Sequence, residues 1–357
     1  MMRALLARVV VLAVTAATLP ALAGCGGSSS SGSASGGLRA ALAAVKAGPR
    51  SRQYFEWGDT KRLRQLAHLR PDGTPSSRSS ANDRFAVVSG TGLGALAPIA
   101  PTLTPVTGLQ LFAADRAISI GTPPRSGTRL DGSGVGGGAL PGKLRAKGSR
   151  ETSVARHKLL AIGTEGSLQA TDAFGVGLLN HFDRVIVNDD TVVTGGYLEP
   201  VLELAGGSPS LGVDPARSAA ASCLGNVSWA VLLATTPPAA VNGIPGGAEL
   251  VALGGRTPNA TKAEDVVCIV YGAPAAASAE EARIRHRLVP PVVPPHALTP
   301  LGAVYSAPVI DTTSANGRSS ARATLEVRPQ KRPGFLVEVY DHGDLGPLLG
   351  ASSPPGP

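Results

Sequence analysis

Acid–base chemistry in this chain would have to come from histidines that lie far apart in the sequence. They are His68, His157, His181, His286, His296 and His342. A histidine acts as a general base when a carboxylate orients it beside a nucleophile, and such partners can come from distant positions. No serine has G-x-S-x-G surroundings, and no lysine follows a serine by three residues. We therefore expect surface or core histidines and no catalytic residue.

Two acidic clusters could supply oxygen ligands to a metal ion. One is Asp341-His342-Gly343-Asp344, and the other combines Asp189-Asp190 with Asp183. A calcium site needs about six to eight oxygen ligands, and neither cluster reaches that number. Each cluster is predicted to be a polar turn after a strand, and we expect no metal and no other cofactor.

A glycine pattern between Gly90 and Ala95 matches the dinucleotide fingerprint G-x-G-x-x-A and follows an apolar run. A functional fingerprint needs an uninterrupted helix after the glycines, so that the helix N-terminus faces the pyrophosphate. Pro98, Pro101 and Pro105 interrupt that helix. Nucleotide binding is therefore not expected.

The most specific functional signal in the sequence surrounds Cys25. Leu22, Ala23 and Gly24 precede it, and this pattern is typical of the lipobox read by lipoprotein-processing enzymes. We expect the thiol to take a diacylglyceryl group and the chain to carry acyl chains such as palmitate. Two chains, at roughly 0.8 kcal/mol per buried methylene, anchor a protein almost permanently.

The residues around this motif fit an exported lipoprotein. Arg3 and Arg8 precede an apolar stretch at residues 9–19, which is too short to cross a bilayer as a stable helix. Ordinary signal cleavage after Ala23 is the alternative and would leave a free thiol at Cys25. Residues 26–37 favour lipid attachment, because a Gly/Ser-rich run of this kind serves as a flexible tether.

The two remaining cysteines, Cys223 and Cys268, are predicted to form a disulfide bond. An extracytoplasmic compartment is oxidising, and the lipid accounts for the third cysteine. Metal binding by two cysteines is the weaker alternative, since no histidine or further cysteine lies at ligand spacing.

Composition restricts the partners of the protein. The formal charge of +8 falls to +6 when Arg3 and Arg8 are removed with the signal. The positive charges are scattered without interleaved aromatic residues, which argues against nucleic-acid binding. A basic surface on the outer face of the membrane could instead meet an envelope protein, anionic lipid or a wall polymer.

The fold class indicated is α+β, with a mainly antiparallel sheet and helices packed on it, after a cleaved signal peptide and a flexible tether. The length suggests two domains or one large one. The expected segments are a signal peptide (1–24), the lipidated cysteine and tether (25–37), an N-terminal α+β domain (38–175), a C-terminal α+β domain with the disulfide (176–350) and a disordered tail (351–357).

In the first domain we expect a helix at residues 38–47, a strand at 53–57 and a helix that begins after Asp59 as its N-cap. A strand is expected to start near residue 118. Glycine-rich residues 132–138 interrupt the pattern.

The second domain has clearer signals. We expect a strand at residues 184–188, a turn at Asp189-Asp190 and a helix near 197–205. Asp214 and Pro215 should begin a helix that Gly225 ends, with Cys223 in its last turn. Further predictions are a meander of strands (227–234, 249–253 and 266–271), a helix that Ser278 and Glu281 cap and that ends at 288, and two last strands (323–328 and 335–340).

The chain resembles a group of actinobacterial secreted lipoproteins of uncharacterised function at residues 54–59, 111–121, 184–190 and 223–225. This resemblance covers most of the body after the tether, with a departure at residues 132–138. It implies a lipid-anchored location on the extracytoplasmic face of the cell membrane and a two-cysteine α+β body. It implies no activity.

Three hypotheses of function follow from different classes. The first is a noncatalytic binding or envelope accessory protein. The second is a carrier of solute or lipid, which requires a deep cleft or an apolar cavity. The third is an extracytoplasmic hydrolase, which requires a histidine, a carboxylate and a nucleophile that converge in a pocket.

Overall fold

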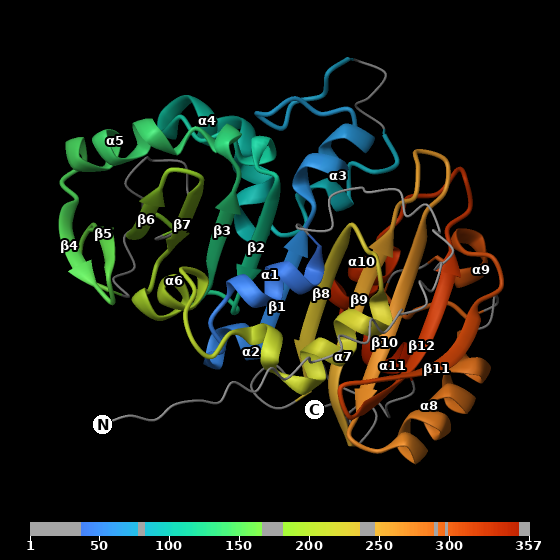
Figure 1. Ribbon diagram of the computed structural model, residues 1–357. Coiled ribbons are helices and arrows are strands. Elements are labelled where there is room, and N and C mark those ends of the chain that lie inside the picture. Colours follow the sequence, from blue (N-terminus) through green and yellow to red (C-terminus); the bar gives the residue numbers. More distant parts are fainter. Residues whose placement is uncertain are drawn as a thin grey trace, which may run out of the picture. The chain divides into compact units, whose positions relative to one another are not determined.

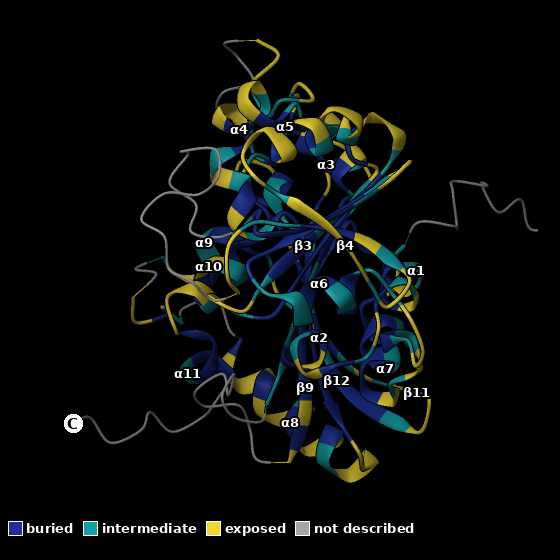
Figure 2. Ribbon diagram, turned by 90° about the vertical axis from the view of Figure 1, so that its left-hand side faces the viewer, coloured by how far each residue is buried: buried dark blue, intermediate teal, exposed yellow. Residues whose placement is uncertain are grey.

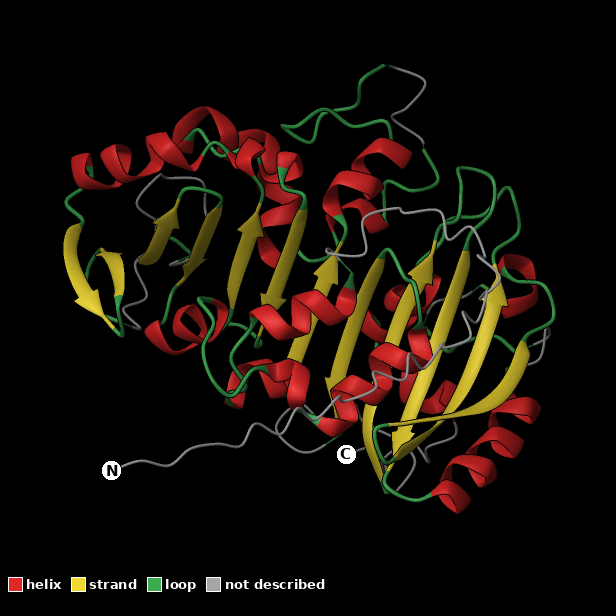
Figure 3. Ribbon diagram, viewed as in Figure 1, coloured by secondary structure: helices red, strands yellow, loops and turns green. Residues whose placement is uncertain are grey.

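The protein is built on an antiparallel sheet that carries helices on both faces (Figures 1 and 3). The computed structural model describes residues 37–77, 83–165, 181–235, 247–288, 292–296 and 299–349. The strands are β1 (Tyr54–Gly58), β2 (Arg116–Ile120), β3 (Gly127–Asp131), β4 (Arg150–Val154), β5 (His157–Ala161), β6 (Arg184–Asn188), β7 (Thr191–Gly195), β8 (Trp229–Ala234), β9 (Ala248–Arg256), β10 (Glu264–Tyr271), β11 (Val309–Ala315) and β12 (Arg318–Glu326). Their order across the sheet is β11-β12-β10-β9-β8-β1-β2-β3-β7-β6-β5-β4. The predicted α+β class is confirmed.

Short helices connect these strands. They are α1 (Leu38–Ala44), α2 (Pro49–Gln53), α3 (Thr60–Leu66), α4 (Ala100–Thr107), α5 (Leu140–Ala146), α6 (Leu198–Leu204), α7 (Pro215–Leu224), α8 (Pro274–Arg287), α9 (Leu301–Val304), α10 (Phe335–Asp341) and α11 (Leu345–Leu349). Of the helices in the described part of the chain, none is long and apolar enough to span a membrane.

The two faces of the sheet follow from the alternation of side chains along each strand. On β1, Phe55 and Trp57 enter the core cluster that α1, α6 and α7 cover, and we name this side the α7 face. Tyr54 packs against the cluster that contains α8, α10 and α11, and we name that side the α8 face. A third cluster, with α4 and α5, also covers the α8 face. Figure 2 shows the buried strands between these layers.

The chain traces a similar path twice. The meander β1-β2-β3 is followed by α5 and then by return strands, the last of which, β7, pairs with β3. The meander β8-β9-β10 is followed by α8 and then by return strands, the last of which, β12, pairs with β10. Because β1 and β8 are antiparallel neighbours, the two paths are related by a half-turn about an axis through the sheet. The hairpin β4–β5 belongs to the first path alone.

Two helix starts confirm the predicted caps. Asp59 Oδ1 accepts a hydrogen bond from the backbone N–H of Arg62 at 3.1 Å. Asp214 directly precedes Pro215, and its Oδ1 accepts a hydrogen bond from the backbone N–H of Arg217 at 3.2 Å. The meander β8-β9-β10 is also confirmed.

The structure corrects two predicted elements. Residues 335–340 form the helix α10 instead of a strand, with Phe335, Leu336 and Val339 buried on one side. This spacing is helical, and Asp265 accepts the backbone N–H of Gly334 directly before the helix. The helix α8 begins at Pro274, so Ser278 and Glu281 lie inside it and do not cap it.

The predicted boundary between domains, at residues 175 and 176, lies outside the described residues and stays a prediction. The described residues on both sides of it belong to one compact unit and to the same sheet. The strand β1 from the first predicted domain lies between β2 from that domain and β8 from the second.

Candidate functional site

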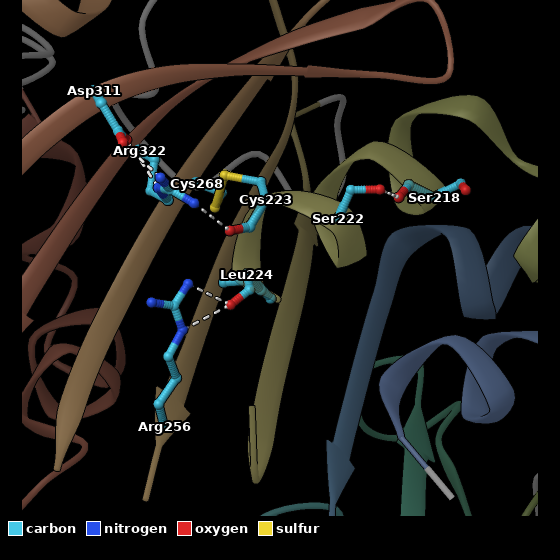
Figure 4. The surroundings of a disulfide bond; sticks show 8 residues. All are labelled: Ser218, Ser222, Cys223, Leu224, Arg256, Cys268, Asp311 and Arg322. Carbon is cyan, nitrogen blue, oxygen red and sulfur yellow. Dashed lines mark hydrogen bonds and ion pairs between the residues drawn. A yellow bond between two sulfur atoms is a disulfide. The ribbon is translucent and has the colours of Figure 1, made fainter. Parts of the chain in front are cut away.

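Cys223 and Cys268 form the predicted disulfide bond (Figure 4). Cys223 lies in the last turn of α7, and Cys268 lies in the middle of β10. Both side chains are fully buried. The bond therefore joins a helix end on the α7 face to a central strand, which is a structural role.

Two arginines hold the same helix end (Figure 4). Arg256 donates from Nε and Nη2 to the Leu224 carbonyl oxygen, at 3.0 and 2.8 Å. Arg322 donates to the Cys223 carbonyl oxygen at 3.5 Å. The last carbonyl groups of a helix lack partners within the helix and carry partial negative charge, so cations stabilise them.

The predicted lipobox residues and the cysteine predicted to carry lipid lie outside the described part of the chain. They are Leu22, Ala23, Gly24 and Cys25. Lipid attachment therefore stays a prediction.

The glycine pattern permits a close approach of backbone to backbone. Gly92 has φ +87° and Gly94 has φ +52°, and a Cβ atom on Gly94 would lie 2.6 Å from Ser119 Oγ. A Cβ atom on Gly92 would collide with the carbonyl oxygen of Ala117. The glycines thus let this segment lie directly on β1 and β2. Residues 88–90, where the fingerprint requires the end of a strand, form a 3-10 helix.

Glu56 on β1 holds residues 90–95 against the sheet, a role that the sequence alone does not predict. Its Oε1 accepts the Gly92 N–H at 2.7 Å, and its Oε2 accepts the Tyr54 hydroxyl at 3.0 Å. Burial raises the pKa of Glu56, although both hydrogen bonds oppose that rise. Ser119, opposite Glu56 on β2, donates to the Gly92 carbonyl oxygen at 3.0 Å. The alternation of β1 places Glu56 on the same side as Tyr54 and is the only sequence signal for this role.

Two described histidines contact a carboxylate: His68 Nε2 lies 3.8 Å from Asp83 Oδ2, and His296 makes a closer contact. His296 Nδ1 lies 2.6 Å from Asp344 Oδ1, and the His296 backbone N–H donates to Oδ2 at 2.6 Å. The Asp344 side chain is fully buried, while 72% of the imidazole is exposed. The pair thereby fastens residues 292–296 to the turn between α10 and α11.

The residues of the two acidic clusters lie in different surroundings. Asp183 is buried at the start of β6, whereas Asp189 and Asp190 are exposed beyond the other end of that strand. Within the described ranges, no three potential metal ligands come together. Asp344 lies in a turn as predicted, but α10 precedes that turn instead of a strand.

A recess opens beside the start of α10, on the α8 face. Its volume is about 300 Å³, and the residues that line it are Val87, Thr299, Val304, Gln330, Lys331, Arg332, Pro333, Phe335 and Glu338. Val304 and Phe335 are buried, whereas Lys331, Arg332 and Glu338 are exposed. An apolar floor with a charged rim suits a group that has one apolar and one charged end.

A buried carboxylate supports the floor of this recess. Asp265 Oδ2 accepts the hydroxyl of Tyr305 at 2.6 Å and the N–H of Gly334 at 2.9 Å. Burial raises the pKa of Asp265 to about 7, while these hydrogen bonds lower it. Since Tyr305 follows Val304 and Gly334 precedes Phe335, Asp265 positions both apolar floor residues. Its carboxylate is fully buried and does not line the recess.

The recess offers both charged and apolar groups for binding. Among its described lining residues, Thr299 carries a hydroxyl group. Lys331 and Arg332 offer charged donors to an anionic group, and the floor offers apolar contact.

Comparisons with known proteins give no relative: no protein-family model, curated protein or solved structure matches this chain. The resemblance to actinobacterial lipoproteins therefore stays a hypothesis.

Proposed function

We propose that the protein is a lipid-anchored, extracytoplasmic binding protein without catalytic activity, and that the recess beside α10 takes an anionic group of its partner. The disulfide supports the location, because such bonds persist in oxidising compartments. The lipobox and the Gly/Ser-rich residues 26–37 support the anchor. The single observation that carries the binding role is the buried apolar floor beneath an exposed cationic rim.

The size of the recess restricts its occupant. Ligand pockets in proteins span roughly 300–1,000 Å³ and enclose most of a ligand. At about 300 Å³ the recess lies at the lower end of that range. It fits a side chain of an envelope protein, a lipid headgroup or a unit of wall polymer better than a whole lipid, which disfavours the carrying of lipid.

A hydrolase is the second candidate, and His296 with Asp344 is the observation in its favour. A buried carboxylate on Nδ1 and an exposed ring are the arrangement of a general base. No described hydroxyl or thiol group is hydrogen-bonded to this imidazole. Purified protein should therefore fail to cleave ester and amide substrates, and turnover that is lost in His296→Ala would favour the hydrolase.

The anchor is tested by mass spectrometry of the N-terminal peptide of protein extracted from membranes. We expect acyl groups on Cys25, and we expect Cys25→Ala to leave the membrane fraction. An unmodified Cys25 thiol in the membrane-derived protein would contradict the anchor.

The recess is tested by photocrosslinking from two exposed valines. Val87 lies at the rim of the recess and is 52% exposed, while Val213, before α7, is 68% exposed. A photoreactive residue at position 87 should give a specific adduct in cells, and one at 213 should not. The adduct should disappear when Lys331 and Arg332 are changed to Glu. Equal adducts at both positions, or an adduct that persists in this variant, would contradict binding at the recess.

A further inference from the structure

The N-terminal segment enters the body on the α7 face. The first described helix, α1, packs there, with Leu38 and Leu42 in the core cluster of that face. Twelve residues, 26–37, separate Cys25 from α1. Twelve residues span at most about 40 Å in any conformation. A lipid on Cys25 would therefore hold the entry point on the α7 face within about 40 Å of the membrane.

Exposed cations surround this entry point. Arg39 on α1 donates to Ser222 Oγ of α7 at 2.7 Å, and Lys46 is exposed just after α1. The side chain of Arg52 on α2 is 55% exposed, and that of Arg125, in the turn between β2 and β3, is 52% exposed. We name Arg39, Lys46, Arg52 and Arg125 the α1–α2 surface.

The acids beside this surface leave its positive charge in excess. Glu199 on α6 is shared by Arg50 at 2.8 Å and Arg125 at 3.8 Å. Asp214 is likewise shared by two arginines, Arg217 at 3.3 Å and Arg52 at 3.7 Å.

Two further acids on this side are already bound to backbone groups. Glu203 is buried and accepts the backbone N–H groups of Arg50 and Ser51. Glu165 accepts the N–H of Leu198 at 3.1 Å.

We propose that the α1–α2 surface rests on anionic phospholipid headgroups of the membrane that holds the lipid anchor. This inference rests on the proposed anchoring at Cys25. The partner follows from charge complementarity and from the short reach of residues 26–37. The orientation turns α4 and the recess of the α8 face away from the lipid, so that the recess stays open to a partner.

The contact has a predictable strength. Each Lys or Arg close to an anionic membrane raises partitioning about fivefold, and the attraction falls off within a Debye length of roughly 10 Å. Replacing Arg39, Lys46 and Arg125 by Gln should therefore weaken electrostatic binding about a hundredfold. A second group of cations, near α5 and β4, provides a matched control: Lys143, Lys147 and Arg156.

The test uses full-length protein purified from membranes, with acylation of Cys25 checked by mass spectrometry. The protein is reconstituted in vesicles of phosphatidylcholine with or without phosphatidylglycerol, and the headgroups carry a fluorescence quencher. Ala43→Cys places a label on the exposed side of α1, and Thr102→Cys places one on α4 of the opposite face. A thermal melt confirms that each variant is folded.

We expect the label at position 43 to be quenched more than the label at 102 in anionic vesicles only. The difference should vanish in the triple variant Arg39→Gln, Lys46→Gln and Arg125→Gln. It should persist in the control Lys143→Gln, Lys147→Gln and Arg156→Gln. Equal quenching of both labels in anionic vesicles, or loss of the difference in the control alone, would overturn the proposed surface.

A failed anchor is recognised separately. If Cys25 carries no acyl group, the proposed anchoring is wrong, and the surface is then tested on the same protein by its partitioning into anionic vesicles. A hundredfold loss in the triple variant, with little change in the control, would still support the surface. Equal partitioning of both variants would overturn it.

Discussion

Tyr305 and Asp265 share a hydrogen bond of 2.6 Å inside the protein, where 1% of Tyr305 and none of Asp265 is exposed. They come from different segments of the α8 face, and Gly334 closes the arrangement with its backbone N–H. A carboxyl group in this position carries a high cost of ionisation, because burial disfavours its charge. The ionisation of Asp265 therefore makes the free energy of unfolding depend on pH.

Changing Asp265 to Asn should alter the pH dependence of unfolding. The folded-state pKa of about 7 lies above the ordinary value, so the folded protein retains a proton that the unfolded chain loses near pH 4. The resulting stabilisation is fully present below about pH 4 and is lost as the pH rises to about 7, by up to roughly 4 kcal/mol. Urea unfolding near pH 5 and near pH 8 should show the variant gaining stability relative to the native protein at the higher pH. The same difference at both pH values would contradict the raised pKa.

Removing the disulfide by Cys223→Ala and Cys268→Ala should lower the free energy of unfolding by about 4 kcal/mol. The estimate follows from closing a loop with a separation of 45 residues in the chain-entropy model. Chemical denaturation of the variant, compared with reduced and oxidised native protein, measures it. Since Arg256 and Arg322 still hold the end of α7, the variant should keep its native circular dichroism. Loss of that spectrum under native conditions would show that the two arginines do not suffice.

Gly92→Ala should destabilise the protein by more than 2 kcal/mol, in the range of roughly 2–4 kcal/mol for strained, overpacked sites. The new Cβ atom would meet the Ala117 carbonyl oxygen and the backbone nitrogen of Gly58. Gly138→Ala is the matched control, because nothing lies within 4 Å of its Cβ position. Thermal melts should show a clear loss for the first variant and nearly none for the control. Equal melting temperatures would argue against the close approach of this segment to the sheet.

His296→Ala should loosen the segment at residues 292–296, while the backbone N–H at position 296 still donates to Asp344 Oδ2. The variant loses the contact of the imidazole with Asp344, which is worth roughly 1–3 kcal/mol when it leaves a buried acceptor without that partner. Limited proteolysis should cut near this segment faster than in the native protein. His286→Ala, at an exposed position near the end of α8, is the control and should change nothing. Unchanged proteolysis in both variants would rule out the fastening role.

Local signals explain why part of the fold could be predicted. Asp214 and Pro215 begin α7, and Gly225 ends it, because each residue type suits its backbone position. The disulfide followed from counting cysteines. The hairpin of β6 and β7 shows the limit of local signals. They predict the turn at Asp189-Asp190 but not the strand that follows it. Its pairing with β6 is local, but its pairing with β3 joins residues far apart in the sequence and is invisible in a local pattern.

The candidate site was hidden from the sequence for a similar reason. Phe335 belongs to a run that alternates well enough for a strand, and Asp265, 69 residues away from Gly334, decides that a helix begins there. The sequence places His296 apart from the other histidines and Asp344 in an acidic cluster, and nothing in it indicates that the two meet in the fold. Interactions between groups so distant in the sequence are set by tertiary packing, which local composition does not encode.

The central place of β1 in the sheet has a mechanical consequence. Between the N-terminal segment and β1 lie only α1 and α2, and β1 is hydrogen-bonded to β2 on one edge and to β8 on the other. A pull applied through the N-terminal segment would thus load the middle strand in shear, with two rows of hydrogen bonds resisting together. An outer strand such as β4 or β11 has only one such row and would peel away at lower force.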